Sequence, residues 1–184
     1  LDHLTQEIRV RLLTQAAIGQ FGQLIFEYAA ETERFELDFL RVQKADGEVV
    51  TVEPSAMQEL TAPVSREAPI YTDWRQRHVT VPTLQVGDTL VYRFRLETHT
   101  PLVPGHFWFE HSFLPATMIL EEILEIDLPA DRPVHLKTAV AFQPEVREAA
   151  GRRIYRWHQT HPRPEAEPAE AEKKKEQENE EEKD

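Results

Sequence analysis

Apolar and polar residues alternate with a period of two over much of the chain, which is typical of strands that bury one face. The clearest case runs from residue 89 to residue 97. Its apolar positions predict a buried face and its charged positions an exposed face: Leu90, Tyr92, Phe94 and Leu96 against Arg93, Arg95 and Glu97. We therefore predict a long strand with one side in a hydrophobic core.

A second alternating segment changes phase in the middle. Phe35, Leu37 and Phe39 are predicted to share one face, and the apolar positions then shift to Leu40 and Val42. A shift of one residue moves every following side chain to the other face of a strand. This pattern predicts a β-bulge or a change of sheet after Phe39.

Two short Gly and Asp pairs separate alternating segments and are predicted to form turns. Asp46-Gly47 is a strong hairpin signal. Gly87 supplies the backbone freedom that a tight turn needs, and Asp88 caps neighbouring backbone N–H groups. We assign Asp46, Gly47, Gly87 and Asp88 to turn formation, and we prefer this assignment to presentation of a functional carboxylate.

The remaining segments complete an all-β pattern. We predict a hairpin or meander over residues 8–28 that turns between Gly19 and Gly22, followed later by a Pro-rich connection over 54–76 with a helical turn near 55–60. A short strand is predicted at 78–81. Residues 117–128 are predicted to form a strand, although their apolar spacing also fits a helix, and the last two strands are predicted at 134–142 and 152–158. About nine or ten strands predict an antiparallel β-sandwich, of which the immunoglobulin-like form is the commonest.

Charge divides the chain into two parts. Residues 165–184 contain ten acidic residues and four lysines, and almost nothing that could be buried. We therefore predict a β-sandwich domain at residues 1–161 and an acidic low-complexity linker or tail at residues 162–184, disordered or at most a solvated helix.

Composition excludes several classes of function. The net charge is −12, and outside the tail 23 acidic residues face 17 basic ones, so nucleic acid is not an expected partner. The chain contains no cysteine, which excludes a thiol nucleophile within it. No apolar run approaches the roughly 20 residues that span a bilayer, so we expect no membrane span here. The start at Leu1, without Met or a signal-peptide pattern, leads us to expect an excised fragment whose targeting signal is missing.

The polar residues offer little catalytic chemistry. His106 and Glu110 would share one face of a predicted strand, but two ligands are fewer than zinc requires. Asp73, Asp88 and Glu110 are conceivable acid–base groups, and no phosphate loop or nucleophile motif accompanies them. We therefore predict no catalytic residue, no metal and no cofactor.

Aromatic residues offer a possible contact surface. Trp74, with Tyr71 and Asp73 beside it in the Pro-rich connection, is the best candidate for contact with a ligand or partner. Its ring could stack on a sugar face. Trp108 and Trp157 fall on predicted strands and are expected in the core.

Three short patterns follow one another in a fixed order: "ADGEVV" at residues 45–50, "APIYTDWRQRHVTVP" at 68–82 and "LQVGDTLVYRF" at 84–94, with "PGHFWFE" after them. Together they resemble the N-terminal domain of unknown function that precedes a transglutaminase-like domain in many bacterial envelope proteins. The resemblance covers roughly residues 5–161. It carries over no catalytic residues.

The resemblance implies an immunoglobulin-like sandwich in an exported, periplasmic or envelope protein. It also implies a downstream papain-like domain with a Cys-His-Asp set, which this chain cannot supply. The expected function is that of a non-catalytic accessory domain that positions or recruits substrate for that partner domain. The alternative is a stand-alone module that binds cell-wall glycan or peptide.

Overall fold

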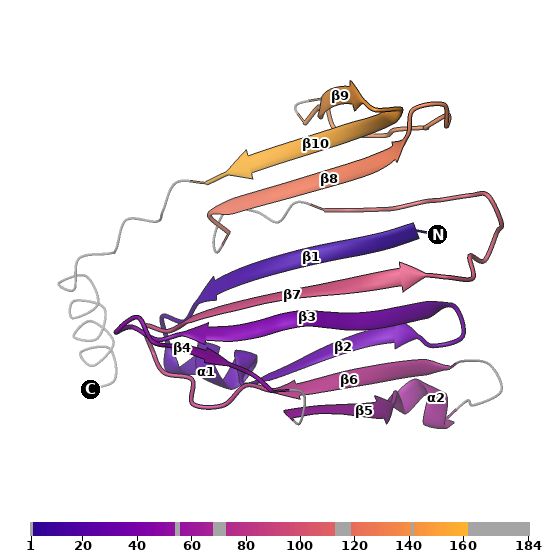
Figure 1. The fold of residues 1–184 in the computed structure, drawn as a ribbon. Coiled ribbons are helices and arrows are strands. Elements are labelled where there is room, and N and C mark those ends of the chain that lie inside the picture. The colour runs from indigo at the N-terminus through magenta and orange to yellow at the C-terminus, as the bar shows by residue number, and fades with distance from the viewer. Residues whose placement is uncertain (1, 54–55, 68–72, 113–118, 141, 162–184) are drawn as a thin grey trace, which may run out of the picture. The chain divides into compact units, whose positions relative to one another are not determined.

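The computed structural model describes residues 2–53, 56–67, 73–112, 119–140 and 142–161 (Figure 1). The chain divides into two compact units, Leu1–Phe109 and Glu110–Asp184. Every paired strand is antiparallel. The predicted all-β antiparallel class is therefore confirmed, while the immunoglobulin-like type stays a prediction. The predicted tail, residues 162–184, lies outside the described residues.

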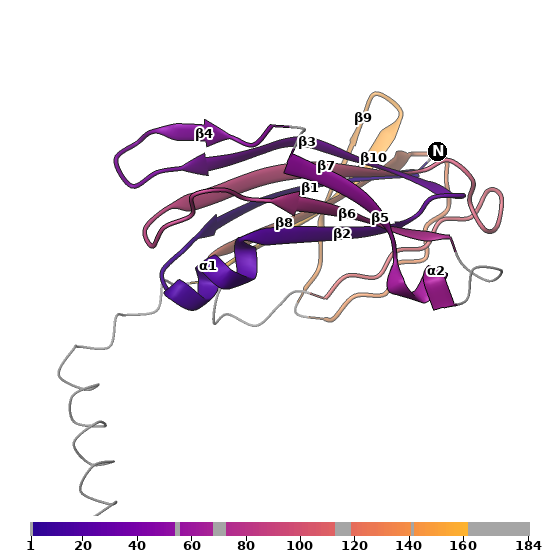
Figure 2. The ribbon, with the colours of Figure 1, turned by 90° about the horizontal axis from the view of Figure 1, so that it is seen from below.

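The first unit contains two sheets. The four-stranded sheet has the order β1 (Asp2–Arg11), β7 (Thr89–Thr98), β3 (Glu33–Gln43) and β4 (Val49–Thr51). The three-stranded sheet has the order β2 (Gln23–Ala29), β6 (Trp74–Thr80) and β5 (Met57–Thr61). Figure 2 shows these sheets as two layers, with α1 (Gln15–Phe21) and α2 (Pro63–Glu67) near opposite ends of the three-stranded layer.

The core of the first unit lies between its two sheets. Leu40, Leu90 and Tyr92 from the four-stranded sheet pack with Leu24 and Val79 from the other. Leu90 and Val79 are fully buried. This confirms the predicted inward face of β7, because the alternation places Leu90 and Tyr92 on the side that meets the second sheet.

An aromatic cluster extends the core along β7. The ring of Phe26 lies 4.8 Å from that of Phe35 and 5.1 Å from that of Phe94, measured between centroids. These residues come from β2, β3 and β7, so one cluster joins both sheets. Such ring pairs add stabilisation beyond the apolar area that they bury.

The predicted hairpin over residues 8–28 is wrong. β1 and β2 belong to different sheets, and α1 connects them. Thr14 caps this helix, since its hydroxyl accepts a hydrogen bond of 3.2 Å from the Ala17 N–H. Gly19 lies inside the helix rather than at a turn. The cap outweighs the low helix propensity of one glycine.

The predicted bulge in β3 is confirmed, one residue earlier than expected. The register with β7 shifts between Leu37 and Phe39, which leaves Asp38 as the extra residue. Phe39 therefore lies opposite Arg93 on the outer face of the sheet, instead of sharing a face with Leu37. Its ring is covered by the guanidinium groups of Arg41, at 4.7 Å, and Arg93, at 5.3 Å.

The segment 54–76 is more regular than its prolines suggested. It contains β5, α2 and the start of β6. The helical turn predicted near residues 55–60 is confirmed only at Ala56, which is in a 3-10 turn and whose N–H donates to the Glu53 carbonyl at 3.0 Å; residues 57–60 are strand. β5 is a strand because it pairs along β6, with Glu59 opposite Arg77. Residues 54–55 and 68–72 lie outside the described part of the chain.

The second unit contains one sheet with the order β8 (Glu121–Pro129), β10 (Arg152–Thr160) and β9 (Glu145–Ala149). The strand preferred over a helix in residues 117–128 is confirmed from Glu121 onward. The final hairpin pairs β9 with β10, so the predicted strand at 134–142 is wrong. Trp157 is buried, and its indole N–H donates to the Phe142 carbonyl at 3.2 Å.

Candidate functional site

Two turns meet at one end of the four-stranded sheet. Gly87 has φ of 97°, in the left-handed region that favours glycine, and its N–H donates to the Leu12 carbonyl at 2.7 Å. Asp88 is only 1% exposed, and its Oδ2 accepts a hydrogen bond of 2.9 Å from the Gln85 N–H. Asp88 thus closes the loop that leads into β7.

The ion pair between Lys44 and Asp88 joins the two turns. Lys44 Nζ lies 2.8 Å from Asp88 Oδ2 and also donates to the Thr83 carbonyl. Burial alone would raise the pKa of the Asp88 carboxyl, but hydrogen bonds from Lys44 and from the Gln85 backbone hold that pKa below its ordinary value. Asp88 is therefore an ionised structural group. The sequence patterns did not identify Lys44, because its partner lies 44 residues away.

The Asp46-Gly47 turn forms the other side of this corner. Gly47 has φ of 96°, and Asp46 Oδ1 accepts a hydrogen bond of 3.0 Å from the Glu48 N–H. The hairpin joins β3 to β4. Both Asp residues thus bond backbone groups within their own turns.

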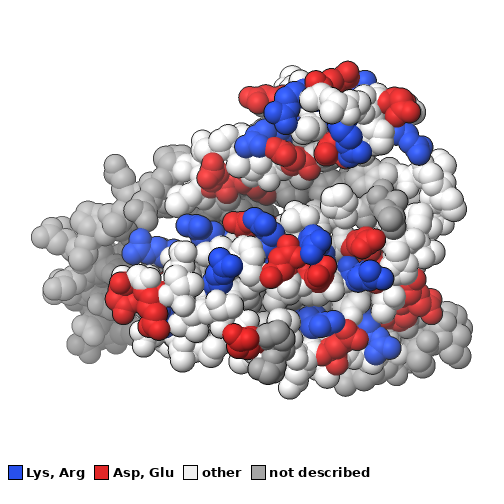
Figure 3. Space-filling view, viewed as in Figure 1, with Lys and Arg blue, Asp and Glu red and all other residues white. Residues whose placement is uncertain are grey.

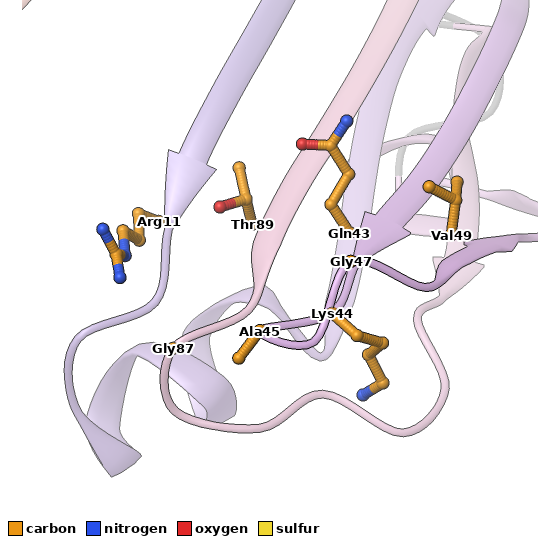
Figure 4. A pocket seen from close by; sticks show the side chains of 8 residues that line it. All are labelled: Arg11, Gln43, Lys44, Ala45, Gly47, Val49, Gly87 and Thr89. Carbon is orange, nitrogen blue, oxygen red and sulfur yellow. The ribbon is translucent and has the colours of Figure 1, made fainter.

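A shallow hollow of about 310 Å³ lies beside these turns (Figure 4). Its walls combine turn residues with side chains on the outer face of the sheet: Arg11, Gln43, Lys44, Ala45, Gly47, Val49, Gly87 and Thr89. Arg11, Thr89 and Gln43 lie opposite one another on three adjacent strands, and Val49 on β4 continues the row. The hollow therefore offers a guanidinium, a hydroxyl and an amide in one line.

Three arginines gather next to this hollow. Arg9 and Arg41 lie on either side of Val91 in the neighbouring row of the sheet, and Arg11 follows Arg9 on the same face of β1. We call Arg9, Arg11 and Arg41 the arginine patch. Among the described residues, none of the three pairs with a carboxylate. Figure 3 shows basic side chains at this end of the four-stranded sheet, at the left, with acidic side chains beside them.

Several ion pairs lie at the other end of the same outer face. Arg93 pairs with Glu7, and Arg95 pairs with Glu36 at 2.9 Å and with Asp38 at 2.8 Å. A second hollow there, of about 350 Å³, has mixed walls: His3, Thr5, Arg34, Glu36, Arg95 and Glu97. The ion pairs described on this face thus lie outside the arginine patch.

A polar cluster also lies at the edge of the three-stranded sheet. The Tyr28 hydroxyl donates to Glu59 Oε2 at 2.6 Å, and Arg77 pairs with the same oxygen at 2.6 Å. Burial, followed by the bond to Glu59, raises the pKa of Tyr28, while the hydrogen bond from Tyr28 lowers the pKa of Glu59. Glu59 is therefore an ionised acceptor, and an acid catalyst near neutral pH would need the opposite shift.

The predicted contact residues have separate positions. Tyr71 lies outside the described residues. Asp73 accepts a hydrogen bond from the Glu31 N–H and so holds the turn between β2 and β3. Trp74 begins β6 and is 41% exposed, and its carbonyl accepts from the Ala62 N–H at 2.9 Å. Asp73 thus stabilises a backbone turn, and Trp74 lies partly at the surface.

The segment around His106 is not a strand, so the shared face predicted for His106 and Glu110 does not exist. Trp108 is 64% exposed, and its predicted place in the core is wrong. His111 instead approaches Glu122, with 2.8 Å between Nε2 and Oε1. Within the described ranges, no three His, Asp or Glu side chains are grouped in a way that could hold a metal ion. Those ranges also contain no helix long and apolar enough to cross a bilayer.

Comparisons with known proteins identify one family model and one solved structure. The family model, DUF3857, is described as a domain of unknown function with a solved structure, and it matches residues 3–165. The solved structure is that of a "putative protease" from Parabacteroides distasonis, with a TM-score of 0.69 and 15% sequence identity. The match covers 91% of this chain and 33% of that one, so this chain spans about a third of the length of the Parabacteroides protein. No curated protein matches the chain.

Proposed function

The chain belongs to the DUF3857 family of domains of unknown function, and from this premise we propose that it is a non-catalytic interaction domain of a longer hydrolase-like protein. The observation that carries the proposal is the unequal coverage of the structural match. Nearly all of this chain corresponds to a third of the Parabacteroides protein. A domain that forms one part of a longer chain can bind substrate and position it for the adjacent domains.

The chemistry of the described residues supports a role without catalysis. The chain has no cysteine. The pKa of Glu59 is lowered, first by its bond from Tyr28, and that of Asp88 is lowered by Lys44 and the Gln85 backbone against the effect of burial. Both carboxylates are therefore ionised partners of local cations. A general acid or base that works near neutral pH needs its pKa shifted toward that range.

We further propose that the neighbouring domain is transglutaminase-like, with a Cys-His-Asp set. In such a set the histidine increases the thiolate population, and the carboxylate orients the imidazole. The interaction domain would bring a peptide substrate to that thiolate. The motif resemblance described above motivates this step, and it also motivates the proposal that the protein is exported to the bacterial envelope.

Reading the coding sequence beyond Asp184 tests the domain arrangement. We expect a domain with a Cys, His and Asp arrangement in the same frame. A frame that continues without such residues would overturn the link to a transglutaminase-like partner. The purified chain itself should release no product from peptide substrates, and turnover by this chain alone would overturn the non-catalytic role.

A second candidate is a stand-alone module for cell-wall glycan or peptide, favoured by the 41% exposure of Trp74 at the start of β6. Titration with peptidoglycan fragments, followed by tryptophan fluorescence, tests it. A saturable change that disappears in Trp74→Ala would support this module. The same change in the wild type and in the variant would remove Trp74 from the site.

A further inference from the structure

We propose that the arginine patch binds the carboxylates of an extended acidic peptide segment. This inference rests on the proposed interaction function and names the surface and the partner chemistry for it. The patch lies on the outer face of the four-stranded sheet, which has one side in the core and the other at the surface.

The spacing of the patch fits an extended chain. Arg9 and Arg11 are two residues apart on β1, so their positions are separated by about 7 Å along the strand. In an extended peptide, alternate residues have the same spacing and point to the same side. A peptide with glutamates at alternate positions can therefore place one carboxylate near each of these two arginines.

The third arginine widens the target across the sheet. Arg41 lies in the same row as Arg9, two strands away, which is about 10 Å. Val91 lies between them in this row and is 5% exposed, and the Arg41 guanidinium lies 4.7 Å from the centre of the Phe39 ring. The arginines thus adjoin apolar side chains, an arrangement that a carboxylate with an aliphatic stem can match.

The charge of the patch is uncompensated within the described residues. On the same face the acidic side chains of Glu7, Glu36 and Asp38 pair with Arg93 and Arg95. Guanidinium groups bind carboxylates through two parallel hydrogen bonds, which makes arginine well suited to this partner. Because the whole chain carries a net charge of −12, an acidic partner would be repelled by most of it and attracted at this end.

The hollow beside the patch supplies neutral donors. Thr89 and Gln43 continue the row that begins with Arg11, and the side chains of all three line the hollow. Gly47 adds no side chain, and a Cβ built there would meet nothing within 4 Å. A carboxylate at Arg11 would therefore find further hydrogen-bond donors and open space.

A peptide suits this surface better than a nucleic acid. The patch is small, and paired acidic side chains adjoin it on the same face, with Glu7 next to Arg9 along β1. Binding to a phosphate backbone depends on many cations that follow a continuous strand of charge. A peptide with a few spaced carboxylates can be bound by the three arginines of the patch.

The test uses the full chain and a short fluorescein-labelled peptide of alternating glutamate and serine, followed by fluorescence anisotropy at low salt. The key variant changes all three patch arginines to glutamine. We expect its affinity for the peptide to fall about tenfold, since exposed ion pairs contribute modestly and three are lost. Added salt should weaken binding to the wild type and have little effect on the variant.

A charge-matched variant serves as the control. Arg34→Gln, Arg75→Gln and Arg95→Gln together change the net charge by the same amount, at positions of the first unit outside the patch. We expect this control to bind within about twofold of the wild type, as general charge effects on exposed sites are small. Equal losses in the two triple variants would contradict the proposal, because net charge alone would then explain the binding.

Two further readouts complete the test. A variant with lysine at the three patch positions keeps the positive charge but loses the planar guanidinium groups that form two parallel hydrogen bonds with a carboxylate. Its affinity for the peptide should therefore lie between those of the wild type and the glutamine variant. An oligonucleotide of equal charge that bound more tightly than the peptide would overturn the assignment to carboxylates. Absence of peptide binding to the wild type would overturn the inference alone, because the interaction function is measured separately, by turnover in the longer protein.

Discussion

Replacement of Asp88 by asparagine removes the charge that joins two turns while it keeps the shape of the side chain. In the wild type, Oδ2 lies 2.8 Å from Lys44 Nζ and 2.9 Å from the Gln85 nitrogen, and Asp88 is 1% exposed. Loss of one partner from a buried ion pair costs about 3 to 5 kcal/mol. Lys44 keeps its bond to the Thr83 carbonyl, so we expect a loss of about 2 to 3 kcal/mol in the free energy of unfolding.

Urea denaturation followed by far-UV circular dichroism measures this difference, and its pH dependence identifies the cause. The folded-state pKa of Asp88 is lowered, so its contribution to stability is complete above the unfolded pKa of about 3.9 and declines as the pH falls toward the folded value. The gap between wild type and Asp88→Asn should be constant from about pH 5 to 7 and narrow below about pH 4. Equal stability at neutral pH, or a gap unchanged in acid, would refute this reasoning.

A double-mutant cycle with Lys44→Met serves as the control. If the ion pair carries the effect, the losses from Lys44→Met and Asp88→Asn should not add, and their coupling should be about 1 to 3 kcal/mol. Additive losses would mean that the hydrogen bond from Gln85 stabilises the turn without help from the lysine.

Two other predictions concern the core and the turns. Phe94→Ala should lower the free energy of unfolding by about 3 kcal/mol, since it removes a ring from the aromatic cluster. Arg93→Ala should lower it by less than about 1 kcal/mol. Equal losses in urea denaturation would show that the wrong face of β7 has been assigned to the core. Gly87→Ala should cost about 1 to 2 kcal/mol because φ is 97° there. Gly19 lies inside α1 with open space around a built Cβ, so Gly19→Ala should stabilise the fold by up to about 1 kcal/mol. Thermal denaturation should therefore show a lower Tm for Gly87→Ala and a higher Tm for Gly19→Ala, and shifts in the same direction would contradict the assignment of Gly87 to a turn and Gly19 to a helix.

The sequence predicted the strands that obey a simple alternation. In β7 every second residue is apolar, and Leu90 and Tyr92 are buried as expected. The bulge in β3 was also visible, because its apolar positions change phase. These features are local, so they can be recognised without knowledge of the partner strands.

The elements that the sequence did not predict depend on neighbours or on competing signals. β5 places Glu59 toward Tyr28 and leaves Leu60 45% exposed, which reverses the expected order of polar and apolar faces. The helix α1 contains Gly19, which favoured a turn, although Thr14 marks its start. The Thr14 cap is the signal that could have identified this helix.

The arginine patch shows how much of the candidate site could be predicted from the sequence. Arg9 and Arg11 are recognisable as neighbours on one face of a strand, but Arg41 joins them only through the register of β1, β7 and β3. Lys44 meets Asp88 in the same way, across two turns. Strand order and register are long-range properties, and the sequence patterns alone do not specify them.

The central claim is that the chain assists catalysis by a neighbouring domain through binding. Steady-state kinetics on peptide substrates, with the longer protein compared with its catalytic domain alone, test this claim most directly. We predict that loss of the chain raises KM and leaves kcat nearly unchanged, because the removed contacts act on substrate binding and not on the chemical step. Unchanged KM, or loss of kcat at constant KM, would contradict the account.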